Sequence, residues 1–311
     1  MVTGRITWCQ LFSEPGNGSD LAGLTTRAER DGDEWVVNGQ KLWTTGAHTA
    51  DYGMLLARTD WDQPKHRGIT YFAFPMRQDG VEVRGVHQMN RHTSFNEVFL
   101  TDARVDHASV VGEVGDGWRG ALTTLSYERG LGARATIGSS RVGRTRQEAA
   151  AEHEAYNRTY IWYPQRAGRV DKALPSAQAN GVADDPIIRQ RVAGLTSLDR
   201  VASWTVARAA AARAAGHRPG PEGSIAKLLG SEIARRSNAT HAAIAGAQGM
   251  LAAADADDPV VSEILVSTPA ASIAGGTDEI QHNIVGERTL GLPKEPSVDA
   301  DIPFREVKVN R

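Results

Sequence analysis

Hydrophobic positions change their spacing near residue 115. Before that point they occur in short runs or alternate with polar residues, as in strands. The clearest runs are 52–58, 69–74, 80–86 and 96–105, and Asn38-Gly39 predicts a hairpin within residues 34–43. Gly, Asp and Pro separate these short strands. They therefore predict a small antiparallel β-barrel or β-sandwich over residues 1–115.

After Gly117 the apolar positions repeat at helical spacing. The pattern predicts one helix from Trp118 to about residue 157. It predicts a second that opens at Asp184, a third over about 221–253, and short ones after Pro259 and Thr277. The second helix is opened by Asp184-Asp185-Pro186, with proline in its first turn. Its inward stripe is Ile188, Val192, Leu195 and Leu198; that of the third is Ile225, Leu228, Leu229 and Ile233. These proportions indicate an antiparallel four-helix bundle.

The resulting prediction is an α+β chain. A β domain covers residues 1–115, a helical domain covers 116–293, and a polar tail covers 294–311. Within the helical domain, residues 158–183 are rich in Gly, Pro, Arg and aromatic residues. They are predicted to form an irregular, exposed connection.

Composition narrows the class of protein. The formal net charge of the 311 residues is −2, which gives no reason to expect a nucleic-acid partner. Cys9 is the single cysteine, so an intrachain disulfide is impossible. The nine histidines show no metal-ligand spacing. No apolar run predicts a membrane span or a signal peptide, and we expect a cytoplasmic protein without a metal.

A loop of glycine and small polar residues, Ser13-Glu-Pro-Gly-Asn-Gly-Ser-Asp20, lies near the start of the chain. These residue types are typical of turns, and a plain turn is the simplest interpretation. A loop with open N–H groups and serine hydroxyls can also hold an anion or the polar edge of a flavin ring. The string lacks the third glycine of a dinucleotide fingerprint, which argues against a nicotinamide-dependent dehydrogenase.

Two further strings stand out. Trp43-Thr44-Thr45 follows the predicted hairpin, where an aromatic residue is normally part of the core. The second string runs from Ala274 to Pro293 and includes Gly275-Gly-Thr-Asp-Glu279. Taken alone it predicts a well-capped helix, with Thr277 as the N-cap and two acidic residues in the first turn.

Together the three strings resemble the acyl-CoA dehydrogenase family, and the resemblance covers residues 8–145 and 184–304. It implies FAD as cofactor and oxidation of an acyl-CoA to a trans-2-enoyl-CoA, as in fatty acid β-oxidation. Electrons would leave through an electron-transfer flavoprotein. The flavin neighbours it implies are Phe12, Ser13, Gly18, Ser19, Trp43, Thr44, Thr45, Thr277 and Glu279, and Ser19 would also contact substrate. It further implies a tetramer built as a dimer of dimers.

The reaction needs a carboxylate that removes the substrate's α-proton. Many family members carry it directly before the Gly-Thr of the C-terminal string, where this chain has Gly275. A second class carries it on the first helix of the C-terminal domain, in a string similar to Leu125-Ser-Tyr-Glu-Arg129. We therefore expect Glu128 to be the base and Arg129 to be a substrate neighbour. The alternatives are a solvated Glu–Arg pair on a helix face, or Glu279 as the base.

The chain also departs from the family pattern. The resemblance begins about ten residues into the sequence, so the family's helical N-terminal domain is missing from it. A misassigned start, a fragment, or a partner subunit covering the gap would each account for this. A Gln-x-x-Gly-Gly-x-Gly string that reaches a neighbour's cofactor becomes Ala243-Ile-Ala-Gly-Ala-Gln-Gly249. Alternatives to an active homo-oligomer are therefore a non-catalytic subunit that completes a paralogue in a mixed tetramer, or a relative with oxidase or nitro-group chemistry.

Overall fold

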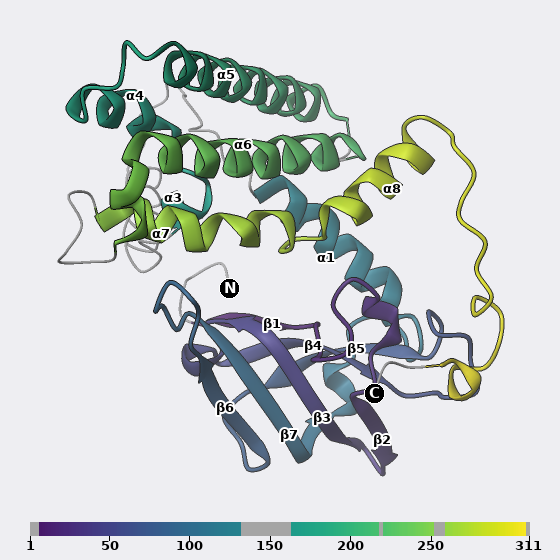
Figure 1. The fold of residues 1–311 in the computed structure, drawn as a ribbon. Helices are drawn as coiled ribbons and strands as arrows, with labels where there is room; N and C mark the ends of the chain where they lie inside the picture. The colour runs from purple at the N-terminus through teal and green to yellow at the C-terminus, as the bar shows by residue number, and fades with distance from the viewer. Residues whose placement is uncertain (1–5, 132–162, 218–219, 252–258, 309–311) are drawn as a thin grey trace. The chain divides into compact units, whose positions relative to one another are not determined.

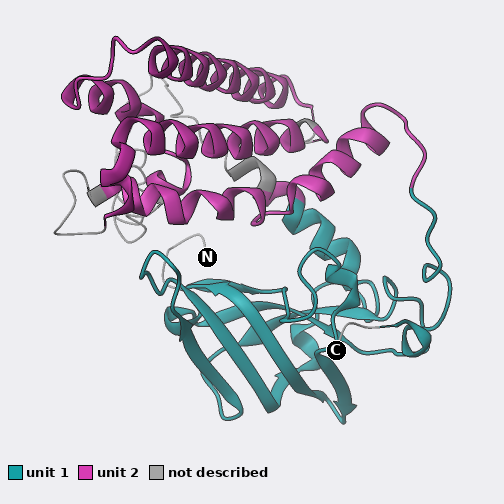
Figure 2. Cartoon of the chain, in the orientation of Figure 1, with its two compact units in different colours: residues 1–125, 295–311 teal, residues 126–294 magenta. Residues whose placement is uncertain are grey.

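The computed structural model describes residues 6–131, 163–217, 220–251 and 259–308 (Figure 1). The chain divides into two compact units (Figure 2). The first unit contains residues 1–125 and 295–311, and the second contains residues 126–294. In chain order, the second unit is thus an insertion between the two parts of the first.

The first unit is built on a curled sheet of seven strands. The strands are β1 (Trp8–Leu11), β2 (Arg27–Asp31), β3 (Glu34–Thr45), β4 (Tyr52–Arg58), β5 (Ile69–Pro75), β6 (Val81–Val86) and β7 (Phe95–Asp106). Their order is β1-β4-β2-β3-β7-β6, and β5 pairs with β4. The α+β class is confirmed. The sheet is mixed rather than purely antiparallel, because β1 and β2 both run parallel to β4.

The predicted hairpin at Asn38-Gly39 is wrong. β3 continues through both residues, and the turn lies instead at Gly32, which has φ 61° between β2 and β3. Asn38 exchanges hydrogen bonds with Asp102 on β7, at 2.9 and 3.0 Å. A Cβ on Gly39 would lie 2.5 Å from Thr26 Oγ1. The glycine is therefore present for a close strand approach and not for a turn.

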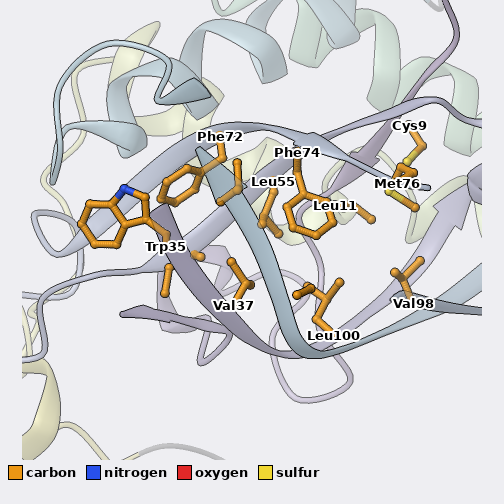
Figure 3. Packing of buried hydrophobic residues seen from close by; sticks show 14 of the residues in the cluster. Cys9, Leu11, Trp35, Val37, Leu55, Phe72, Phe74, Met76, Val98 and Leu100 are labelled. Atoms are coloured by element: carbon orange, nitrogen blue, oxygen red, sulfur yellow. The ribbon is translucent and has the colours of Figure 1, made fainter. Parts of the chain in front are cut away.

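One face of the sheet carries the main core of the first unit (Figure 3). Its buried side chains include Cys9, Leu11, Trp35, Val37, Leu55, Phe72, Phe74, Met76, Val98 and Leu100. Trp35 packs its ring edge-on to Phe72, with centroids 5.7 Å apart. Since Trp35 and Val37 alternate with more exposed positions, the first half of β3 has the period of a half-buried strand.

A second cluster of the first unit lies under helix α1 (Gly117–Leu131). It joins Phe12 and Leu24 to Tyr71, against which Ala121 of α1 packs. Gly117 allows the close contact, because a Cβ there would lie 2.5 Å from the Tyr71 backbone nitrogen. The start of α1 is thus fixed to the sheet by packing.

The second unit is helical. After the end of α1 it contains α3 (Tyr163–Arg166), α4 (Val170–Ala179), α5 (Pro186–Ala214), α6 (Glu222–Ala245), α7 (Pro259–Ser267) and α8 (Asp278–Arg288). Asp185 caps α5 by accepting hydrogen bonds from Ile187 N and Ile188 N. The predicted start of this helix and the buried positions Ile188, Val192 and Leu195 are therefore confirmed.

Residues 163–179 differ from the irregular connection expected over 158–183, because they form α3 and α4. Ala173 and Ala177 of α4 are buried in a cluster with Val192 and Ile233. Small side chains let α4 pack closely on α5 and α6, and this tertiary contact outweighs the helix-breaking tendency of Pro175. Residues 132–162, which include most of the long helix expected after Trp118, lie outside the described residues.

Candidate functional site

The Ser13–Asp20 loop is held at its base by a buried ion pair. Lys41 of β3, with no exposed side-chain surface, places its Nζ 2.9 Å from Glu14 Oε1 and 3.1 Å from Phe12 O. Glu14 also accepts hydrogen bonds from Thr25 N at 2.7 Å and Thr26 N at 2.8 Å. The carboxylate thus ties the start of the loop to the segment that follows it.

The ionisation of this pair follows from its surroundings. Burial disfavours the charged carboxylate of Glu14, but the Lys41 ammonium and the hydrogen bonds from Thr26 and Thr25 outweigh it and lower the pKa of Glu14 to about 2. Burial lowers the pKa of Lys41, and Glu14 opposes that effect. Sequence reasoning did not single out either residue. The available signal was that Lys41 has the same strand alternation as the apolar residues Trp35 and Val37, since a lysine is rarely buried unpaired.

Trp43 lies on the exposed face of β3 and not in the core. Strict alternation from Trp35 would turn position 43 inward, but an irregularity in the β3–β7 register between Lys41 and Thr44 reverses the pattern. The Trp43 side chain is 55% exposed, its φ is 63°, and Phe95 supports its ring edge-on at 5.8 Å. The strand therefore presents a flat indole at the surface, with its backbone held in a strained conformation.

The two threonines after Trp43 face opposite ways. Thr45 is exposed, on the same side as Trp43, whereas Thr44 is buried. Among the described residues the Thr44 hydroxyl has no hydrogen-bond partner, and the Thr44 carbonyl accepts a bond from Asn96 Nδ2 at 2.9 Å. Thr45 is therefore the hydroxyl available beside the indole.

The loop supplies backbone groups and open space more than side chains. The Phe12 ring is buried against Tyr71, so a ligand can meet only the Phe12 backbone. Ser13 is half-buried, and its carbonyl accepts a hydrogen bond from Leu42 N at 2.9 Å. Gly18 and Ser19 are exposed, and a Cβ on Gly18 would have no atom within 4 Å. The structure thus links the loop to β3 just before Trp43.

The other candidates belong to the second unit. Thr277 caps α8 by accepting a hydrogen bond from Ile280 N at 3.3 Å, as the sequence predicted. Glu279 is exposed in the first turn of α8, and hydrogen bonds from its own backbone N–H and from the Thr277 side chain lower its pKa. The adjacent Asp278 is buried and pairs with Lys227 at 2.8 Å and Arg235 at 2.5 Å on α6. Sequence reasoning missed this pairing, which fixes the start of α8.

The turn before α8 depends on two glycines. Gly275 and Gly276 have φ values of 69° and 86°. Gln281 closes the turn by donating to Gly275 O at 3.0 Å. A Cβ on Gly275 would meet no atom within 4 Å, so that a larger residue there would have space but would adopt a conformation that L-residues rarely use.

Glu128 lies near the end of the described part of α1 and is half-buried. It follows Leu125, which packs against the cluster beneath the start of this helix. Arg129 belongs to the same helix, but its side chain lies outside the described residues.

The sequence led us to expect neither a metal site nor a membrane-spanning segment. Within the described ranges, no group of three or more His, Cys, Asp or Glu side chains could hold a metal ion. Across those same ranges, every helix is too short or too polar to cross a bilayer.

Comparisons with known proteins assign both units to one protein family. The family model described as the middle domain of acyl-CoA dehydrogenase matches residues 9–103, and the C-terminal domain of the same family matches residues 170–290. The acyl-CoA dehydrogenase IpdE1 of Mycobacterium tuberculosis is 37% identical over 294 residues, which cover 93% of this chain and 67% of that protein. FadE34 of the same organism is 35% identical, over 94% of this chain and 36% of its own length.

Solved structures show the same fold. A structure titled Tcur3481-Tcur3483 steroid ACAD has a TM-score of 0.75 and 27% identity, and the match covers 94% of this chain and 70% of that one. The ChsE4-ChsE5 complex of Mycobacterium tuberculosis has a TM-score of 0.70 at 27% identity, with the same coverage. This chain spans about two thirds of the length of IpdE1 and of both structures.

Proposed function

Because the chain belongs to the acyl-CoA dehydrogenase family, we propose that it oxidises an acyl-CoA thioester to the trans-2-enoyl-CoA, with Glu128 as the base that removes the α-proton. Enzymes of this family are FAD-dependent. The observation that carries the proposal is the exposed indole of Trp43, held at φ 63° beside the Ser13–Asp20 loop. An exposed, strained tryptophan is costly unless it serves a ligand.

The residues of the first unit fit an isoalloxazine ring. The Trp43 indole offers a flat apolar surface, and the Thr45 hydroxyl lies on the same side of β3. At Gly18 and Ser19 the backbone is open. Its N–H and C=O groups can form hydrogen bonds with the polar edge of the ring. We assign Phe12, Ser13 and Thr44 to the same site through their backbones. Thr277 and Glu279, at the N-terminus of α8, are assigned to the cofactor from the second unit.

Each residue has a distinct part in the proposed reaction. When bound, FAD supplies the acceptor for the substrate's β-hydrogen, which leaves as hydride. Glu128 takes the α-proton on its carboxylate, and its half-buried position on α1 favours a base that is incompletely hydrated. Arg129 and Ser19 bind the substrate. The exposed Trp43 indole would exclude water from a ring bound against it.

Electrons leave, in this proposal, through an electron-transfer flavoprotein, and the chain assembles as a dimer of dimers or as a mixed tetramer. Two structural neighbours carry titles that name two proteins, Tcur3481-Tcur3483 and ChsE4-ChsE5. These titles support a paralogous partner for this chain as well. Ala243 and Ala247, which replace Gln and Gly of the family string, support a cofactor site completed by such a partner.

The two-protein titles of the neighbours and the alanines at positions 243 and 247 also favour a second candidate function. In it, the chain is a non-catalytic subunit that stabilises an active paralogue. The visible absorption spectrum of the purified chain, recorded anaerobically with and without acyl-CoAs, separates the two. A flavin band that bleaches on addition of an acyl-CoA supports the dehydrogenase. A flavin that bleaches only with the paralogue, and at the same rate when this chain carries Glu128→Gln, supports the second candidate.

A further inference from the structure

The end of the chain is bound to the first unit by main-chain contacts. Phe304 N donates to Gln63 O at 3.0 Å, and Arg305 N donates to Trp61 O at 3.1 Å. Arg305 also pairs with Asp62. Residues 297–306, here called the C-terminal strap, therefore belong to the first unit, as their colour in Figure 2 shows.

The strap covers a buried arginine. The Arg58 guanidinium, which has no exposed surface, lies 3.3 Å from the centre of the Phe304 ring. Its donors reach Ala22 O at 2.7 Å and Leu24 O at 3.2 Å. Burial lowers the pKa of Arg58 to about 10, so the side chain is charged at neutral pH. Phe304, 1% exposed, keeps water from a cation whose hydrogen bonds hold the segment directly after the Ser13–Asp20 loop.

The strap also completes a bridge to the loop itself. Lys65 Nζ lies 2.8 Å from Asp299 Oδ2 and 3.1 Å from Asp20 Oδ1. Burial opposes the charge of Lys65, but hydrogen bonds to Asp299 and Asp20 raise its pKa. The Asp20 side chain is 58% exposed, whereas that of Asp299 is 29% exposed. Asp299 is therefore the better shielded partner, and it keeps the ammonium next to the last residue of the loop.

Both cations thus connect the strap to one stretch of chain, residues 13–24. Lys65, which pairs with Asp299 of the strap, also donates to Asp20. Arg58, which Phe304 of the strap covers, donates to Ala22 and Leu24. We propose that the C-terminal strap is a positioning element for the cofactor loop, in which Asp299 and Phe304 act through Lys65 and Arg58 to hold residues 13–24 in their binding conformation. The assignment of this loop to flavin rests on the proposed function.

A role confined to general stability predicts a different outcome from a role in positioning. If the strap positions the loop, its loss loosens residues 13–24 and leaves the paired strands β3 and β7 unchanged, because local openings of a native protein are confined to the contacts that are lost. If it acts only on stability, the whole first unit opens more often.

Hydrogen exchange of the flavin-free chain distinguishes these outcomes, with the variants Asp299→Asn and Phe304→Leu. Val298→Ala is the matched control, since Val298 lies in the strap but is 94% exposed. We expect amides of residues 13–24 to exchange about tenfold faster in both variants, and β3 and β7 to stay unchanged. Asp299→Glu should restore the wild-type rate. Titration with FAD should then give a Kd weakened by about tenfold in the two variants.

The inference is overturned if residues 13–24 exchange at the wild-type rate in both variants, or if every peptide of the first unit accelerates equally. It is also overturned if the FAD Kd is unchanged although the loop exchanges faster. A wild-type chain that binds no FAD, alone or with its paralogue, contradicts the proposed function instead, and the exchange rates then decide by themselves whether the strap holds the loop.

Discussion

Lys41 Nζ lies 2.9 Å from Glu14 Oε1, and the two side chains are 0% and 4% exposed. The pair joins the middle of β3 to the start of the Ser13–Asp20 loop. Two charges enclosed together are stable only as a pair, because either one alone would be left desolvated without a counterion. The contact therefore fixes the loop beside the strand that carries Trp43.

Removing one member of this pair should be costly. We expect Lys41→Met to lower the free energy of unfolding by about 3–5 kcal/mol, since it leaves the Glu14 carboxylate buried and unpaired. The double variant Lys41→Met/Glu14→Gln should regain much of the loss, because both charges are gone. Urea unfolding measures both. A double variant no more stable than the single one would contradict this account.

The ionisation of Glu14 should also make the free energy of unfolding depend on pH. Its pKa falls from 4.5 to about 2 on folding, so its contribution is complete above the unfolded value and is lost as pH falls from about 4.5 to about 2. That contribution is about 3 kcal/mol, because each pKa unit corresponds to about 1.4 kcal/mol. Unfolding at a series of pH values should show a steeper acid loss in the wild type than in Glu14→Gln. Glu29→Gln, at an exposed residue of β2, should keep the wild-type slope.

Trp43 and Trp35 should respond to substitution in opposite ways. Trp43→Gly removes an exposed side chain and relieves the strain of a positive φ, so stability should change by less than about 1 kcal/mol, while the FAD Kd rises by about tenfold. Trp35→Ala, in the core of the same strand, should cost about 3–5 kcal/mol. Chemical unfolding measures the change in stability, and flavin titration measures the FAD Kd. A large loss of stability in Trp43→Gly would assign that side chain to the core.

Glu128→Gln should lower the rate of flavin bleaching by an acyl-CoA by about 10²–10⁴-fold, because the amide cannot take the α-proton. FAD binding should be retained. Glu279→Gln tests the alternative base, and Glu113→Gln, at an exposed residue of the first unit, is the control. Anaerobic stopped-flow absorbance measures the rate. If Glu279→Gln retains FAD but is inactive, and Glu128→Gln keeps the wild-type rate, Glu128 is not the base.

The exposed face of α5 offers a test of assembly. Trp204 and Val201, one turn apart, are 64% and 44% exposed, which is costly for apolar side chains unless another subunit covers them. We expect Trp204→Glu to convert the proposed tetramer into smaller species. Ser203→Glu, about 100° around the helix, should not. Size-exclusion chromatography with light scattering reports the mass. A wild-type monomer would refute the proposed tetramer.

Local sequence predicted the elements whose signals lie within a few residues. β4 (Tyr52–Arg58) has the bounds that its apolar run indicated, and α5 begins at Pro186 because Asp185 caps it. The Thr277 cap of α8 was predicted for the same reason. Capping and apolar periodicity are properties of neighbouring residues, so a single stretch of sequence carries them.

The failures all involve distant partners. The Asn38-Gly39 signal was outweighed by the pairing of β3 with β7 and by Thr26, which the glycine lets approach. The parallel pairing of β1 with β4 joins residues more than forty positions apart. The helix over Val170–Ala179 forms in spite of Pro175 because Ala173 and Ala177 are buried in a cluster with α5 and α6. No local pattern records these contacts.

In the candidate site, too, some features follow from local sequence and others depend on distant contacts. The sequence by itself determined which strings are present and the family that they indicate, because glycine-rich loops and capped turns are local. Only the tertiary structure decided that Trp43 is exposed while Trp35 is buried, since one register shift of β3 against β7 reverses the face. It alone also buried Lys41 with Glu14 and brought Asp299 to Lys65, because burial and ion pairing depend on which distant segments meet.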